Sequence, residues 1–70
     1  MRHETEVLEV LGRIVHRTND AILFLPQTWQ DGDEVWLPQS QCPEVHREFA
    51  TTGWDRLVVT AWIAKKKGIL

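Results

Sequence analysis

Hydrophobic and polar residues alternate along much of the chain with the two-residue period of half-buried β-strands. Residues 21–25 form a short apolar run, and residues 56–59 form a second one that is rich in β-branched side chains. In residues 34–37, Val35 and Leu37 fall on one face of a strand and Trp36 falls on the other. Pro38 follows directly and cannot donate to a strand ladder, so the pattern predicts that this strand ends there or lies at an edge.

Residues 5–17 fit two structures. Several of their apolar residues have helical spacing, but many are β-branched, and Gly12 would cost a helix about 1 kcal/mol. Leu8, Val10, Gly12 and Ile14 also alternate with the charged residues Glu9 and Arg13. We interpret the segment as a long strand in which Gly12 allows a bend or a bulge, with a helix as the alternative.

Turn residues separate these segments at intervals of about ten residues. The sequence RTND at 17–20 predicts a turn, and Asp31-Gly32 is a hairpin signal. Residues 61–67 are expected to form a short helix that Thr60 caps, Gly68 ends, and the lysines of its last turn stabilise. The predicted strands cover residues 5–17, 21–25, 34–37, 44–50 and 56–59.

Five short strands and a terminal helix predict a mainly β fold in one domain that spans residues 1–70. A small SH3-like or OB-like barrel is the usual solution for this pattern, because closure removes exposed strand edges. Inside such a barrel Val35 and Leu37 fill the core. Trp36 is then outside, where either the terminal helix covers it through Trp62 and Ile63 or a ligand contacts it.

Composition narrows the class of protein. The chain has 70 residues, of which 43% are hydrophobic and 26% charged, as in a folded globular domain. A domain of this size is expected to be stable by only roughly 3–5 kcal/mol. A single cysteine, Cys42, rules out an internal disulfide framework and favours a reducing, cytosolic setting. The longest purely apolar stretch, residues 21–25, is too short to span a bilayer.

No pattern indicates catalysis or a cofactor. Cys42 and His46 are four residues apart, but no third group is placed to orient them as nucleophile and base. The three histidines and one cysteine lack the paired spacing of a zinc site. The glycines are isolated, so there is no phosphate-binding loop. We therefore expect a protein that is not an enzyme and that holds no metal.

The charges suggest two binding surfaces. Ten acidic residues against eight basic ones give a net charge of −2, which disfavours nucleic acid as a general partner. Acidic side chains in the first segment and in residues 31–34 are able to form one face on a barrel, and such a face steers basic partners. Lys65, Lys66 and Lys67 form a basic run that either lies in solvent as a helix end or contacts an acidic partner.

Two stretches resemble a set of small proteins that phages and other mobile elements encode. They are AILF followed by DGDEVWLPQSQ, within residues 21–41, and WIAKKKGIL at 62–70. Residues 42–55 depart from that set. The resemblance implies a compact β-barrel in the cytoplasm of an infected bacterial host. It also implies a non-enzymatic inhibitor of a host defence complex, similar to the anti-CRISPR proteins that mimic DNA with an acidic surface.

Two functions therefore remain open from the sequence. In the first, an acidic face with flanking tryptophans binds a basic host protein. Its expected contact residues are Glu9, Trp29, Asp31, Asp33, Glu34 and Trp54. In the second, exposed tryptophans stack on single-stranded nucleic acid while basic side chains bind its phosphates. The expected phosphate contacts are Arg56, Lys65, Lys66 and Lys67.

Overall fold

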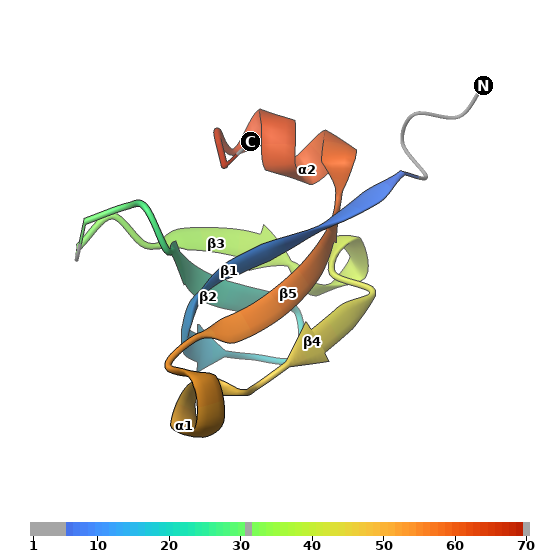
Figure 1. The fold of residues 1–70 in the computed structure, drawn as a ribbon. Helices are drawn as coiled ribbons and strands as arrows, with labels where there is room; N and C mark the ends of the chain where they lie inside the picture. The colour runs from blue at the N-terminus through green and yellow to red at the C-terminus, as the bar shows by residue number, and fades with distance from the viewer. Residues whose placement is uncertain (1–5, 31, 70) are drawn as a thin grey trace.

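The computed structural model describes residues 6–30 and 32–69. Within them the fold is mainly β, with five antiparallel strands in one sheet of order β3-β2-β1-β5-β4 (Figure 1). The sheet is open, since no pairing between β3 and β4 joins its edges in the described ranges, and the predicted barrel is not confirmed. In chain order the elements are β1 (Val7–Arg17), β2 (Ala21–Pro26), β3 (Val35–Pro38), η2 (Gln39–Gln41), β4 (Glu44–His46), α1 (Phe49–Thr52), β5 (Asp55–Thr60) and α2 (Ala61–Lys66).

The predicted first strand is confirmed, and the helical alternative for this segment is wrong. β1 is the central strand of the sheet and pairs with β2 on one side and β5 on the other. Gly12 does not carry the bulge that we expected there, because the register shift lies between Ile14 and His16. Gly12 instead lies tight against β2, where a Cβ atom would overlap the carbonyl oxygen of Leu25. Its missing side chain thus allows β1 and β2 to approach each other.

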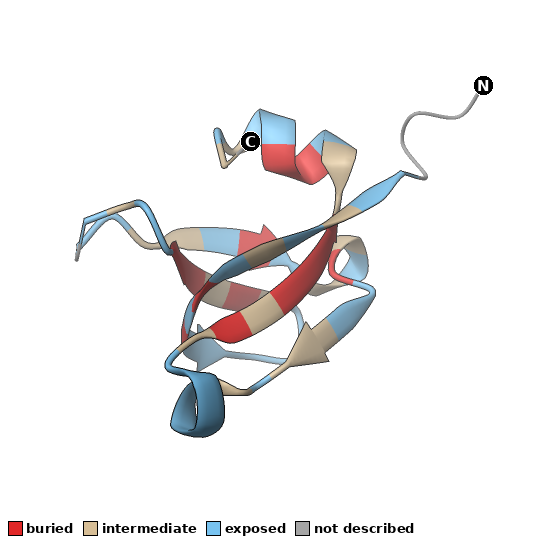
Figure 2. Ribbon diagram, viewed as in Figure 1, coloured by how far each residue is buried: buried red, intermediate tan, exposed pale blue. Residues whose placement is uncertain are grey.

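The core lies inside the curl of the sheet, and α2 covers one end of it (Figures 1 and 2). Strands β2 and β5 supply most of the fully buried side chains, and α2 adds two more residues. The core cluster consists of Ile14, Ile22, Phe24, Leu37, Cys42, Leu57, Val59, Ile63 and Ala64. The residues of this cluster come from the strands, from the connection between η2 and β4, and from α2. No single element of this short chain could bury its apolar side chains alone.

The predicted facing of the third strand is confirmed. Leu37 is fully buried, Val35 packs against the core, and Trp36 lies outside with 45% of its surface exposed. The expected cover for Trp36 is wrong, because its ring neighbour is His16 on β1 and not the terminal helix. Trp62, which we expected to pack, is 49% exposed. α2 is anchored instead by the two buried residues that follow Trp62 in the chain.

The predicted strand at residues 44–50 is correct only in its first half. β4 ends at His46, and Phe49 begins the single turn α1. The Asp55 carboxylate accepts a hydrogen bond from the backbone N–H of Phe49 at 3.0 Å, which stabilises the first turn of a helix in place of a strand. Gly53 ends the turn in a left-handed conformation with φ of 89°. The predicted strand therefore stops after β4.

The terminal helix is confirmed over Ala61–Lys66, together with the cap predicted for it. The Thr60 hydroxyl oxygen accepts a hydrogen bond from the N–H of Ile63 at 3.2 Å, and Gly68 follows the helix with φ of 76°. The same Thr60 hydroxyl donates to the Gln41 side-chain oxygen at 2.6 Å. This contact ties the start of α2 to η2, on the connection between the two edge strands.

Candidate anion site

A β-bulge decides where the last side chain of β1 points. The register of β1 against β2 shifts between Ile14 and His16, so Val15 is an extra residue. Arg17 consequently pairs with Ile22, whose side chain is fully buried. Paired residues in antiparallel strands share a face, so Arg17 lies on the core face at the end of its strand. If the register continued unbroken after Ile14, with Val15 paired, alternation would place Arg17 on the outer face of the sheet.

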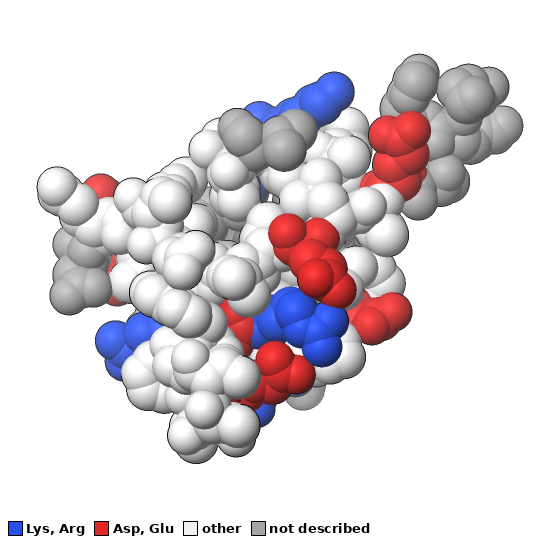
Figure 3. Space-filling model, viewed as in Figure 1, with Lys and Arg blue, Asp and Glu red and all other residues white. Residues whose placement is uncertain are grey.

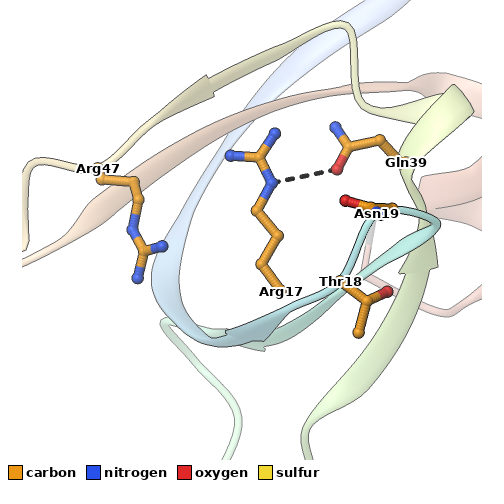
Figure 4. Close-up of a pocket in the computed structure, with 5 residues that line it drawn as sticks. All are labelled: Arg17, Thr18, Asn19, Gln39 and Arg47. Atoms are coloured by element: carbon orange, nitrogen blue, oxygen red, sulfur yellow. Dashed lines mark hydrogen bonds between the residues drawn. The ribbon is translucent and has the colours of Figure 1, made fainter.

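The side chain of Arg17 extends from that position into an open hollow of about 580 Å³ (Figure 4). The β1–β2 turn contributes Thr18 and Asn19 to its wall, and Gln39 stands at the start of η2. The Nε–H of Arg17 donates to the side-chain oxygen of Gln39 at 3.2 Å, which fixes the plane of the guanidinium group. The two terminal nitrogens of that group are then available to a ligand.

Arg47 provides the second guanidinium group of this hollow, from the segment that follows β4 (Figure 4). In the described part of the chain neither Arg17 nor Arg47 forms an ion pair, and no carboxylate lines the hollow. Because Gln39 follows one edge strand and Arg47 the other, the curl of the sheet brings the ends of both edges to one place. The hollow therefore combines two unneutralised cations with polar side chains.

A second, smaller hollow of about 310 Å³ shares Arg47 with the first. Arg13 lies on its wall with its guanidinium carbon 5.3 Å above the centre of the Phe49 ring, a cation–π contact. Asp55 also lines it, but both carboxylate oxygens accept backbone N–H bonds, from Ile14 at 2.9 Å and from Phe49. The cationic surface thus continues from Arg17 through Arg47 to Arg13.

The residues expected to form one acidic face lie in separate places. Glu9 faces outward on β1 and pairs with the guanidinium of Arg56 at 2.8 Å. Asp33 and Glu34 lie in the β2–β3 connection, which projects from one side of the sheet in Figure 1. Asp31 lies outside the described residues. Trp29 is half-buried in the same connection as Asp33 and Glu34, and Trp54 is half-buried between α1 and β5.

The expected phosphate contacts are also divided. Arg56 is held by two carboxylates, Glu48 at 3.3 Å and Glu9 at 2.8 Å, which raise its pKa and use two of its N–H donors. Figure 3 shows acidic and basic side chains lying next to each other on the face in view. Lys65, Lys66 and Lys67 do lie together, at the end of α2. Lys66 is placed over the ring of Trp62, with its ammonium 5.4 Å from the ring centre. Arg56 is therefore neutralised by carboxylates of the chain itself, whereas the basic run lies at the end of α2.

Cys42 has the properties of a core residue. It belongs to the core cluster, is 3% exposed, and donates a hydrogen bond from its thiol to the Pro38 carbonyl at 3.5 Å. Burial raises its pKa from 9.0 to about 11, although the nearby charge of Arg17 acts in the opposite direction. At pH 8 its reactive thiolate fraction is accordingly about a hundredfold below that of an ordinary cysteine.

Arg17, Arg47 and Gln39 were not among the residues that the sequence singled out. Their positions, 17, 39 and 47, belong to three separate segments, and none carries a motif. The signal that could have indicated Arg17 is the pair Val15-His16, which breaks the alternation of β1 just before an arginine. No local signal marks Arg47.

The comparisons with known proteins gave no match: no family model, no curated protein and no solved structure is similar to this chain. Across residues 6–30 and 32–69, no three His, Cys, Asp or Glu side chains are grouped as metal ligands. None of the helices described has the length and apolar character needed to cross a membrane.

Proposed function

We propose that this chain is a non-enzymatic binding module that holds an oxyanion of a larger ligand between Arg17 and Arg47. Phosphate fits this site best, because a guanidinium group offers paired donors that match two oxygens of one phosphate. Thr18, Asn19 and Gln39 supply further polar contacts around the same hollow. The observation that carries the proposal is that two arginines line one polar hollow, and that none of the described residues on its wall is a carboxylate.

The arrangement around Arg56 supports this interpretation by contrast. There the chain neutralises a guanidinium group with two of its own carboxylates. An arginine that serves only the fold is commonly paired in this way when it is partly buried. Arg17 has instead an amide partner that orients it and leaves its charge intact. A guanidinium group that is oriented but not neutralised by a carboxylate is able to bind an anion.

The first prediction concerns inorganic phosphate. We expect the side-chain Nε–H signals of Arg17 and Arg47 to shift with saturation when ¹⁵N-labelled protein is titrated with phosphate at constant ionic strength. Each charge-assisted hydrogen bond contributes about 1.5–3 kcal/mol, so two of them give a dissociation constant on the order of 1 mM. A parallel titration with chloride should leave both signals in place.

Two double variants complete this experiment. Arg17→Ala with Arg47→Ala should abolish saturable phosphate binding. Lys65→Ala with Lys67→Ala removes the same charge from α2 and should leave the binding constant unchanged. Equal shifts with phosphate and chloride, or equal binding by the two double variants, would show that the hollow holds no specific anion.

We propose as a second candidate that the chain binds a basic host protein, the function expected from the sequence for a small phage-type inhibitor. A specific observation favours it. Asp33 and Glu34 project from the sheet on the β2–β3 connection, and no described cation forms an ion pair with either of them. Trp29 lies in the same connection and supplies an aromatic contact beside the acids.

The second prediction tests this candidate by charge reversal. The triple variant Asp31→Lys, Asp33→Lys and Glu34→Lys should lose capture of a basic protein from bacterial lysate, because like charges then face each other across the interface. The Arg17→Ala, Arg47→Ala variant serves as the control and should capture that protein as the parent does. Capture that survives the triple reversal would exclude the acidic connection as the binding surface.

A further inference from the structure

An aromatic row crosses the outer face of the sheet beside the anion site. Trp36 on β3 pairs with Leu23 on β2, and Leu23 pairs with His16 on β1. The rings of His16 and Trp36 are perpendicular, with their centres 6.3 Å apart. Trp36 is 45% exposed, so much of its indole surface is available to a ligand. Leu23 lies between the two rings as an apolar floor.

The row and the hollow lie at the same end of the sheet. His16 is adjacent in the chain to Arg17, whose guanidinium group lines the hollow. On the other side, Trp36 lies three residues before Gln39, which binds that guanidinium. Two strand spacings, about 10 Å, separate β3 from β1. The row lies on the outer face of the sheet and Arg17 on its core face, so a ligand reaches both by passing around this end of the sheet. A flexible chain that carries both phosphates and planar groups is able to make that turn.

We infer that the ligand of the anion site is single-stranded nucleic acid, with a base stacked on Trp36 and a backbone phosphate between Arg17 and Arg47. This inference rests on the function proposed above for the hollow. Stacking on an aromatic side chain requires the open face of an unpaired base, which a duplex does not offer. Charge complementarity comes from the local arginines, although the chain as a whole has a net charge of −2.

The structure also defines the extent of the contact. The cationic surface continues from the hollow through Arg47 to Arg13, which offers a further site for a neighbouring phosphate. Elsewhere on the protein, the acids of the β2–β3 connection and the carboxylates paired with Arg56 repel phosphates. Binding should thus be confined to a few nucleotides, without hydrogen bonds that select particular bases.

The third prediction is a fluorescence anisotropy titration with labelled oligo-dT and oligo-rU of twelve nucleotides. We expect dissociation constants on the order of micromolar at moderate salt. Trp36→Ala should weaken binding about tenfold, because a stacked base is lost, whereas Trp36→Phe should retain most of it. Trp62→Ala is the matched control, because Trp62 on α2 is 49% exposed, close to the value for Trp36. The Trp62→Ala variant should bind the oligonucleotides with the affinity of the parent protein.

The charge variants add a second readout. Arg17→Ala with Arg47→Ala should reduce the slope of log affinity against log salt by roughly 1.4, the value for two contacts to a single strand. Lys65→Ala with Lys67→Ala should leave the slope unchanged. Melting curves of all variants confirm that each is folded before binding is compared.

The outcomes separate this inference from the proposal on which it rests. Phosphate binding in the hollow without oligonucleotide binding, or with an oligonucleotide affinity that Trp36→Ala does not change, overturns the inference and leaves the anion site standing. Loss of both phosphate and oligonucleotide binding overturns both. A larger effect of the lysine variant than of the arginine variant would place the strand on α2 and also overturn the inference.

Discussion

Replacing Asp55 with alanine is expected to unfold most of the protein. Asp55 is 4% exposed, and its two carboxylate oxygens accept the backbone N–H groups of Ile14 and Phe49 at 2.9 and 3.0 Å. The pairing of β1 with β5 ends at Gly12 and Asp55, so no ladder partner in β5 remains for Ile14. Alanine would leave two N–H groups without acceptors and would remove two hydrogen bonds to a charged group.

The expected loss is about 3–6 kcal/mol in the free energy of unfolding, at about 1.5–3 kcal/mol for each of the two hydrogen bonds. A domain of this length has a total stability of roughly 3–5 kcal/mol. Urea denaturation followed by tryptophan fluorescence measures the change. Asp55→Asn retains one acceptor oxygen and should give an intermediate loss. Asp33→Ala, at an exposed position in a connection, should change stability by less than about 0.5 kcal/mol. Equal midpoints for Asp55→Ala and Asp33→Ala would contradict this account.

The two roles of Asp55 also explain which part of the fold the sequence could not predict. The strands at β1 and β3 follow from side-chain alternation, and those at β2 and β5 follow from short apolar runs. Both patterns are local properties of the sequence. The error at residues 44–50 arises because a carboxylate at position 55 binds the N–H of Phe49. Intrinsic preference favours a strand there, and the tertiary contact overrides it. The bend and cap around Phe49 thus depend on a residue that follows it in the chain.

Sheet topology is a further property that the pattern left open. Five strands of this length are compatible with closure, and closure was expected because it removes strand edges. In the structure β3 and β4 remain the two edges, and both are short, with four and three residues. Short edges offer few free backbone groups to other chains, so closure is not needed to limit edge pairing. Between these two edges in the chain lies η2, and a hydrogen bond from the Thr60 hydroxyl to the Gln41 side chain holds η2 against the start of α2.

The candidate site was less predictable than the fold, for reasons of register and charge pairing. Glu9 and Arg56 were assigned to different surfaces from the sequence, yet they are 47 residues apart and form an ion pair. Arg17 reached the hollow only because one extra residue in β1 reversed the face on which it lies. The charges along the chain reveal neither the Glu9–Arg56 ion pair nor the face on which Arg17 lies. What the sequence did indicate correctly is the outward position of Trp36, since facing within a strand follows from alternation.

The second large effect is expected for Gly12→Ala, and its sign distinguishes two physical explanations. Gly12 does not have a positive φ, so backbone preference alone predicts that alanine would stabilise the strand by about 0.5–1 kcal/mol. The packing predicts the opposite. An added Cβ would overlap the carbonyl oxygen of Leu25 and would lie 2.7 Å from a ring atom of Phe24, which is fully buried. Backbone atoms of β2 cannot yield without separation of the two central strands.

We therefore expect Gly12→Ala to destabilise the protein by about 3 kcal/mol or more, as overpacking against a rigid backbone does. Gly53→Ala is the matched control, because Gly53 has φ of 89° and open space around it. Gly53→Ala should lower the free energy of unfolding by only about 1 kcal/mol, the cost of a left-handed backbone at alanine. Urea denaturation of the two variants gives both values. A stability of Gly12→Ala at or above that of the parent would mean that β1 and β2 are farther apart than in this structure. The bulge that directs Arg17 into the hollow lies between the same two strands, so that result would also remove the geometric basis of the anion site.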